Sequence, residues 1–191
     1  VKGDSFNMER QKTQVGAELI GPKSELIDAE IILICVKALK SINIDNLTID
    51  INLPFLREYF LKGISPPLKT TINQYIDIKD TKSLKGLKLE NLNIISKLME
   101  VAGDHLHATK HLLKLKSKGI LVDIIDYYLK VIDIITKNND SIKISIDPLE
   151  NRGFKYHSGL TFTIFSDNLK GEIAKGGSYN ISTGETATGC T

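Results

Sequence analysis

Apolar residues recur at strand and helix spacings in the first third of the chain. A loose alternation over residues 10–20 ends at Gly21-Pro22 and predicts a strand. Ser24 can cap a helix whose apolar residues follow at steps of three and four, namely Ile31, Ile34, Cys35, Ala38, Leu39 and Ile42. Leu47, Ile49, Ile51 and Leu53 then alternate with polar residues. This alternation predicts a half-buried strand, so the opening third is strand, helix, strand.

From Pro54 to about Asn138 the pattern has a helical period and no convincing strand. Five helices are predicted, at residues 55–61, 68–78, 92–102, 105–115 and 120–135. The last is the clearest, because its apolar positions form one wide stripe. No glycine- and serine-rich linker flanks this block. We therefore expect residues 54–140 to be an all-helical insertion packed on the same unit rather than a free domain.

The last third returns to the strand pattern. Strands are predicted at residues 142–146, 156–165 and 171–175, and a final one near Ala187. Asp167-Asn168 indicates a tight hairpin between the second and third of these. Strands from both ends of the chain, with helices between them, predict an α+β fold. Its simplest form is one antiparallel sheet with flanking helices.

Composition narrows the classes of function. The 191 residues are 41% hydrophobic, which suits one globular domain. Lys and Arg number 25 against 23 Asp and Glu, and they are spread out, so we do not expect nucleic-acid binding. No apolar run approaches the ~20 residues that span a bilayer. No secretory leader opens the chain, and we expect a cytoplasmic protein without a membrane segment.

The cysteines and histidines do not predict a metal site. Cys35 and Cys190 have no disulfide or zinc spacing, and we expect two reduced thiols. His107 and His111 share a helix face, with His105 nearby, but no third ligand follows at a familiar spacing. A solvated helix is the preferred interpretation, and we predict no metal or cofactor.

Gly176-Gly177 allows two interpretations that the sequence leaves open. The pair could let the backbone approach a ligand closely, or it could form a bulge in a strand. It is not a phosphate-binding loop, because no Lys followed by Ser or Thr stands at the required spacing.

Several patches together resemble the class II histidyl-tRNA synthetase core. RQKTQVGAELIG, at residues 10–21, resembles motif 2 of that family, and NRGFKYHSG, at residues 151–159, resembles its first histidine-specific signature. AKGGSYN, at residues 174–180, is similar to the second signature, Gly-Gly-Arg-Tyr-Asp, and GETATG resembles the approach to motif 3. The resemblance implies an antiparallel sheet of the class II type. It also implies that residues 1–191 form one truncated catalytic-core domain that begins and ends inside a longer polypeptide.

The same resemblance implies a histidine-like pocket. Its residues would be Gln14, Glu18, Arg152, Tyr156, His157, Gly176 and Gly177, and Arg10 and Arg152 would meet a phosphate or carboxylate. In the family the positions of Glu18 and Gln14 hold the ligand's imidazole and amino group. The alternatives are an exposed polar strand face for Gln14 and Glu18, a loop ion pair for Arg152, and plain packing for Tyr156.

Substitutions inside the signatures argue against catalysis. Lys155 stands where the family has Asp, His157 where it has Tyr, Ser178 where it has Arg, and Asn180 where it has Asp. Exchanging an acid for a base beside a ligand reverses the local field. We therefore predict no catalytic residue and a pocket released from aminoacylation.

The chain looks more like the synthetase-like regulatory subunits of ATP phosphoribosyltransferase, in the first step of histidine biosynthesis. That resemblance implies a short-form catalytic subunit as partner, activation of that subunit, and feedback by free histidine. A homodimer within a hetero-oligomer is the expected assembly. Two alternatives stay open: the core fragment of a histidyl-tRNA synthetase, and a free-standing histidine sensor.

Overall fold

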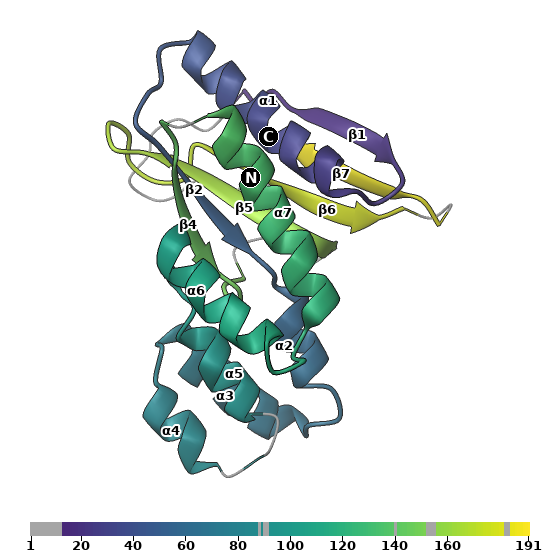
Figure 1. Cartoon of the computed structure of the whole chain (residues 1–191), viewed down its shortest axis with the longest axis vertical. Helices are drawn as coiled ribbons and strands as arrows, with labels where there is room; N and C mark the ends of the chain where they lie inside the picture. The colour runs from purple at the N-terminus through teal and green to yellow at the C-terminus, as the bar shows by residue number, and fades with distance from the viewer. Residues whose placement is uncertain (1–12, 88, 90–91, 140, 152–155, 182–183) are drawn as a thin grey trace.

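The strands come from both ends of the chain and join in one sheet. The structure is a computed structural model that describes residues 13–87, 89, 92–139, 141–151, 156–181 and 184–191. Its strands are β1 (Ala17–Gly21), β2 (Leu47–Asn52), β3 (Gly103–Asp104), β4 (Lys143–Asp147), β5 (His157–Ser166), β6 (Ala174–Asn180) and β7 (Thr186–Cys190). Their order across the sheet is β1-β7-β6-β5-β2-β4-β3, and Figure 1 labels all of them except the short β3.

The direction of one strand pair corrects the predicted sheet. The α+β class with flanking helices is confirmed, and five of the six neighbouring strand pairs are antiparallel. β2 and β4 run parallel, with Ile49 opposite Ile144 and Ile51 opposite Ile146. The expectation of a purely antiparallel sheet is therefore wrong for this pair. Parallel neighbours need a long crossover, and the helical segment between β2 and β4 supplies it.

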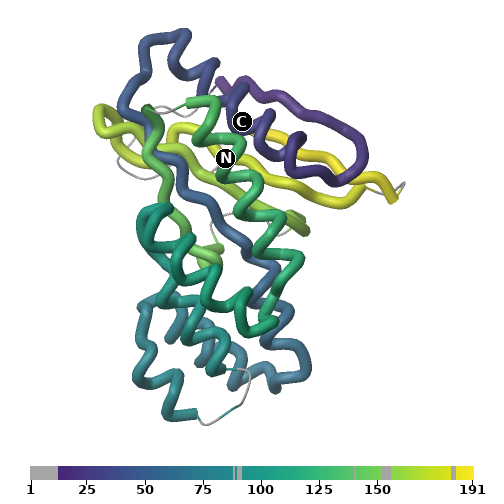
Figure 2. Tube along the Cα trace, viewed as in Figure 1, coloured from purple at the N-terminus to yellow at the C-terminus, as the bar shows by residue number. Residues whose placement is uncertain are grey.

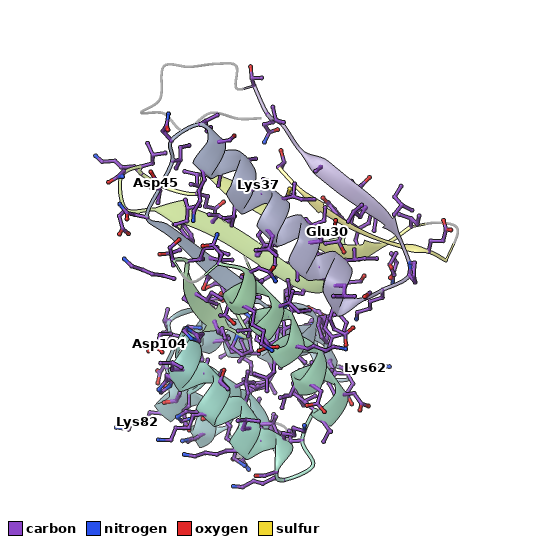
Figure 3. All side chains as sticks on the ribbon, turned by 45° about the horizontal axis from the view of Figure 1, so that its top comes forward. Glu30, Lys37, Asp45, Lys62, Lys82 and Asp104 are labelled. Atoms are coloured by element: carbon purple, nitrogen blue, oxygen red, sulfur yellow. The ribbon has the colours of Figure 1, made fainter. Side chains whose placement is uncertain are left out.

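Two long helices cover one face of the sheet. α1 (Glu25–Ser41) and α7 (Val122–Asn138) contact each other, and α1 also lies against β1, β6 and β7 (Figure 1). Ser24 caps α1 as predicted, since its hydroxyl accepts from the Leu26 N–H at 3.2 Å. The fully buried Tyr128 of α7 donates its hydroxyl to the Ile51 carbonyl at 2.7 Å. Figure 3 shows the exposed Glu30 and Lys37 along the outer side of α1.

The core lies between these helices and the middle of the sheet. Leu47, Ile49 and Ile51 of β2 are 0–1% exposed. Ile164 and Phe162 of β5 lie opposite Ile49 and Ile51 in register. Asp50 and Asn52 of β2 are buried as well, so the expected half-buried strand is buried on both faces. β2 is buried because it lies in the interior of the sheet, with β5 on one side and β4 on the other.

Five shorter helices form the lower part of the molecule in Figures 1 and 2. They are α2 (Phe55–Phe60), α3 (Pro66–Asp77), α4 (Thr81–Gly86), α5 (Leu92–Met99) and α6 (His105–Lys116). The tube in Figure 2 leaves β2, runs through these helices and returns along α7. The buried Arg57 ties them to the segment after β4, because it pairs with Asp77 at 2.6 Å and donates to the Leu149 carbonyl.

Two elements of this segment were absent from the prediction. α4 is one: the Asp80 side chain caps it by accepting from the Ser83 N–H at 2.9 Å, and Leu84 is its buried apolar residue. One apolar residue makes no periodic pattern, which explains the omission. The other is β3, two residues paired with β4, so the expectation of no strand between residues 54 and 138 is wrong.

Element ends differ most near the predicted pocket. β1 begins at Ala17; residues 13–16 lie in no strand, and residues 10–12 lie outside the described residues. β6 runs from Ala174 to Asn180 rather than over 171–175. The tight hairpin at Asp167-Asn168 is also wrong, because the connection occupies residues 167–173 and the Asp167 N–H donates to the Asn46 carbonyl at 3.3 Å. No helix among the described residues is both long and apolar enough to cross a bilayer.

Candidate functional site

A line of paired residues crosses the sheet on the face turned away from α1. Thr188 fixes which face this is, since its hydroxyl donates to Asp28 of α1 at 2.6 Å, and the next residue on a strand points to the other side. In register across the sheet, the residues of this line are Glu18, Gly189, Gly177, Thr161, Asn52 and Asp147. All six are polar or lack a side chain. The face is therefore suited to a polar ligand rather than to a further apolar layer.

One end of this line is hollowed. The hollow has a volume of about 240 Å³ and is lined by Ala17, Glu18, Tyr156, His157, Lys175, Gly176, Gly177, Tyr179, Gly189 and Cys190. Sites for drug-sized ligands are usually larger, at about 300–1,000 Å³. A ligand of the size of an amino acid fits this hollow better than a nucleotide does.

The glycines around the hollow have different reasons to be glycine. A Cβ on Gly176 would lie 2.1 Å from the Gly189 carbonyl oxygen and 2.7 Å from the Phe162 ring. A Cβ on Gly177 would lie 2.7 Å from the Leu160 carbonyl oxygen. Sheet packing therefore requires both. A Cβ on Gly189 would meet its nearest neighbours at 3.4 Å, one of which is a Glu18 carboxylate oxygen, so it would enter the hollow with little clash.

The bulge lies across from the glycine pair rather than in it. His157 pairs with Tyr179 and Thr161 pairs with Gly177, so β5 uses two more residues than β6 over this interval. Gly159 lies inside the bulge, where a Cβ would meet the Ser178 hydroxyl at 2.1 Å. A bulge is therefore present, but it lies in β5 and not at Gly176-Gly177.

Three rings form one wall of the hollow. The ring centroids of Tyr156 and Tyr179 are 5.1 Å apart at 83°, and those of Tyr156 and His157 are 4.7 Å apart at 60°. Both arrangements are edge-to-face. Tyr179 also donates its hydroxyl to the Glu18 carboxylate. This contact joins β6 to β1 across β7 and holds Glu18 at the rim.

The protonation states of these groups follow from their contacts. The hydrogen bond to Glu18 raises the pKa of Tyr179 to about 12, so Tyr179 stays a donor at neutral pH. Burial lowers the pKa of His157, and the charge of Lys175 lowers it further. His157 is therefore neutral at pH 7, and one of its ring nitrogens can accept. The hollow presents a carboxylate, a neutral imidazole and the ammonium of Lys175, which also pairs with Glu172 at 3.7 Å.

A buried polar network continues the line beyond the hollow. The Asn52 amide donates to Asp50 at 3.1 Å and to the Asp147 carbonyl at 3.2 Å, and Ser145 donates to Asp50 at 2.5 Å. Asn52 and Thr161 are directly paired and at most 2% exposed. Within the described residues, the side-chain Oδ1 of Asn52 and the hydroxyl of Thr161 have no hydrogen-bond partner. Such groups are costly to bury, and a water or ligand atom between them would satisfy both.

The structure brings most of the predicted pocket residues together. Glu18, Tyr156, His157, Gly176 and Gly177 all line the hollow. Gln14 does not: it lies before β1 and lines another hollow with Leu39 and Thr191. Its expected position on the same strand as Glu18 is therefore wrong, because the strand starts at Ala17. Arg10 and Arg152 lie outside the described residues, as does Lys155.

Five lining residues were missing from the predicted site, namely Ala17, Lys175, Tyr179, Gly189 and Cys190. Tyr179 could have been found, because it stands two residues after Gly177 and so points to the same face of β6. Lys175 follows from the same alternation. Gly189 could not be found, since its role depends on β7 lying between β1 and β6, and strand order is not written in the sequence.

His105, His107 and His111 lie on α6, and none of them lines the hollow. The His107 and His111 rings stack with centroids 4.4 Å apart, and His107 Nε2 lies 2.9 Å from the Glu100 carbonyl oxygen. Among the described residues no three His, Cys, Asp or Glu side chains are grouped as metal ligands.

Comparisons with known proteins agree on one family. A family model described as histidyl-tRNA synthetase matches residues 1–191. Two curated relatives are ATP phosphoribosyltransferase regulatory subunits, from Paramagnetospirillum magneticum and Rhodospirillum centenum. Each is 31% identical and matches 100% of this chain, which covers 51% and 50% of the relatives. The chain thus spans about half the length of these relatives.

Solved structures show the same fold. An ATP phosphoribosyl transferase (HisG:HisZ) complex from Thermotoga maritima matches with a TM-score of 0.73 and 20% identity, over 92% of this chain and 63% of that one. A protein from Bacillus halodurans, described as an ATP phosphoribosyltransferase regulatory subunit/histidyl-tRNA synthetase, matches with a TM-score of 0.70 and 17% identity, over 92% and 49%. From the match along its whole length and the shared fold, the chain belongs to the histidyl-tRNA synthetase family.

Proposed function

We propose that this chain is part of a non-catalytic regulatory subunit of ATP phosphoribosyltransferase. In this role it binds a short-form catalytic subunit, activates it, and makes it sensitive to free histidine. The observation that carries the proposal is the state of the pocket. The hollow keeps the Glu18 and Tyr179 pair that suits an amino acid, while signature positions that hold charged residues in the synthetases hold others here.

Ser178 is one of the substituted signature positions that the structure describes. It stands at the arginine of the second signature, and it is 4% exposed on the α1 side of β6. Its hydroxyl lies against the bulge of β5, 3.4 Å from the Leu160 carbonyl oxygen. A guanidinium here would have to displace Gly159, whose Cβ position already meets the Ser178 hydroxyl. This position serves packing on the face of the sheet away from the hollow and carries no positive charge.

Free histidine is the proposed ligand of the hollow. Glu18 accepts from the imidazole N–H of the ligand, with Tyr179 holding the carboxylate in place. The rings of Tyr156 and His157 form the wall against which the ligand packs. Lys175 is the cation nearest the hollow within the described part of the chain and would face the ligand's carboxylate. The relatives' own regulatory assignment is consistent with this scheme.

The second candidate is the core fragment of a histidyl-tRNA synthetase. The family model and the retained Glu18 and Tyr179 contact favour it, because both belong to a histidine-binding core. The two functions differ in ATP chemistry. A synthetase activates histidine with ATP and releases pyrophosphate, whereas a regulatory subunit does not.

Isotope exchange of pyrophosphate into ATP, in the presence of histidine and the complete natural polypeptide, separates the two. We expect no histidine-dependent exchange. Exchange that requires histidine and is lost in Glu18→Gln would establish the synthetase instead. Calorimetry with histidine runs alongside, and we expect binding without ATP. If histidine binds but no short-form catalytic subunit co-purifies, the third function, a free-standing sensor, replaces the proposal.

A further inference from the structure

The two cysteines of the chain meet between α1 and β7. Thr188 and Cys190 point to the same side of β7, since they are two residues apart on a strand. Asp28 and Cys35 share one side of α1, since seven residues make about two turns. The hydrogen bond between Thr188 and Asp28 fixes the helix on the strand, and Cys35 then lies over Cys190. Both are free thiols, Cys35 buried and Cys190 half-buried.

The two thiols differ in reactivity. A hydrogen bond from Cys35, assisted by the Ala17 N–H, lowers the pKa of Cys190 to about 6. The same contact and burial raise the pKa of Cys35. A thiolate is the form that attacks a disulfide, so Cys190 is the nucleophile and Cys35 the reserve thiol.

A hollow lies near the pair at the end of α1, lined by residues close to the two cysteines rather than by the cysteines themselves. It has a volume of about 610 Å³ and is lined by Leu39, one turn after Cys35, and by Thr191, next to Cys190. Ala174 of β6 lines it as well. This hollow and the one at Glu18 share Lys175 as a lining residue.

We propose that Cys190 is a site of oxidation by low-molecular-mass disulfides such as oxidised glutathione, and that Cys35 resolves it into an internal disulfide. The Cys190 thiolate attacks one sulfur of the oxidant, forming a mixed disulfide and releasing one thiolate. The Cys35 sulfur then attacks Cys190 and displaces the second thiol, which takes up the Cys35 proton. The protein loses two electrons and two protons, and the oxidant becomes two thiols.

The disulfide between Cys35 and Cys190 would link α1 to β7 directly behind the hollow at Glu18. Cys190 contributes to the wall of that hollow, and Gly189 before it contacts Glu18. A disulfide between positions so far apart in sequence constrains the unfolded chain strongly, so oxidation should raise the melting temperature. This thiol chemistry does not depend on the proposed regulatory function.

The test exposes the reduced complete protein to oxidised glutathione and follows intact mass and peptide maps without reductant. We expect each chain to lose the mass of two hydrogens, with a cross-linked peptide pair containing Cys35 and Cys190. In Cys35→Ala the glutathione adduct should persist on Cys190, and in Cys190→Ser the Cys35 thiol should stay reduced. Wild-type protein that keeps both thiols, or that links two chains instead, overturns the proposal. So does a Cys190→Ser variant in which Cys35 reacts as fast as Cys190 does in the wild type.

Discussion

Individual glycines determine the shape of the hollow at Glu18. Gly176 pairs with Cys190, the residue after Gly189, and the missing side chains of the two glycines point in different directions. At Gly176 a side chain would enter the packed layer beside Phe162, and at Gly189 it would enter the hollow beside Glu18. One glycine is therefore needed for folding, whereas the other is needed only for an open pocket.

Alanine at each position should separate these roles. We expect Gly176→Ala to lower the free energy of unfolding by about 1–3 kcal/mol, because overpacking forces the neighbours apart. Gly189→Ala should leave stability nearly unchanged and weaken histidine binding. Chemical denaturation and calorimetry measure the two effects. Gly86→Ala is the control, since no atom lies within 4 Å of its Cβ position. Equal stability of Gly176→Ala and Gly86→Ala would contradict the packing argument.

Tyr179 tests the orientation of Glu18. Tyr179→Phe keeps the ring but removes the hydroxyl that donates to the carboxylate. A hydrogen bond of this kind contributes about 1 kcal/mol, so we expect histidine to bind about fivefold more weakly in calorimetry. Tyr59→Phe, at a tyrosine 66% exposed on α2, is the matched control and should bind as the wild type does. Unchanged affinity in Tyr179→Phe would remove Glu18 from the proposed ligand contacts.

His157 makes stability depend on pH. Burial lowers its pKa in the folded protein below the ordinary 6.5, so the unfolded chain binds the proton first as the pH falls. The contribution of His157 to the free energy of unfolding is complete above pH 6.5 and is lost as the pH drops toward the folded-state pKa. In His157→Gln, denaturation between pH 7 and 5 should show a shallower decline. A decline as steep as that of the wild type would contradict the assignment.

Asp28 connects three elements. It is 1% exposed on α1 and accepts from Thr188 of β7 at 2.6 Å and from Tyr127 of α7 at 2.9 Å. Burial raises the pKa of its carboxyl, and the two hydroxyl donors oppose that rise. These two hydrogen bonds hold α1 and α7 in place over β7, the strand between Glu18 of β1 and Gly177 of β6.

Removing this carboxylate should loosen the helix layer. We expect Asp28→Ala to lower the free energy of unfolding by about 2 kcal/mol, because it leaves buried hydroxyls without an acceptor. A double-mutant cycle with Thr188→Val isolates the pair, and the two changes should be less than additive. Glu30→Ala, on the exposed side of α1, should have little effect. Strict additivity in the cycle would mean that the contact contributes nothing.

The sequence predicted those elements whose apolar residues are periodic. α1, α7 and β5 have such stripes, and their positions are confirmed within a few residues. α4 has one buried apolar residue, and β3 has only backbone pairing, so neither leaves a pattern to detect. The parallel direction of β4 was also hidden, because it depends on where the crossover returns rather than on the strand's own residues.

The candidate site was predictable where it depends on signature residues. Glu18, Tyr156 and His157 were expected from family resemblance and lie together in the hollow. Gln14 does not line this hollow, because it precedes β1, which starts at Ala17 rather than at residue 10. Gly189 and the Asn52 and Thr161 pair depend on strand order and register, which arise only when the whole sheet forms.

At the scale of the whole molecule, the two faces of the sheet have separate tasks. α1 and α7 bury the apolar face, while the opposite face carries the polar line from Glu18 to Asp147. We propose that residues 54–140 are an insertion between the paired strands β2 and β4, and that the complete protein dimerises within a hetero-oligomer. About half the length of the curated relatives lies beyond the match. The partner must therefore be tested with the complete polypeptide.

The most direct measurement is the rate of ATP phosphoribosyl transfer by a short-form catalytic subunit, titrated with the complete protein. We predict a saturable increase in rate that histidine reverses, with Gly189→Ala still activating but requiring more histidine for inhibition. A rate that stays the same at every concentration of the complete protein would contradict the regulatory function.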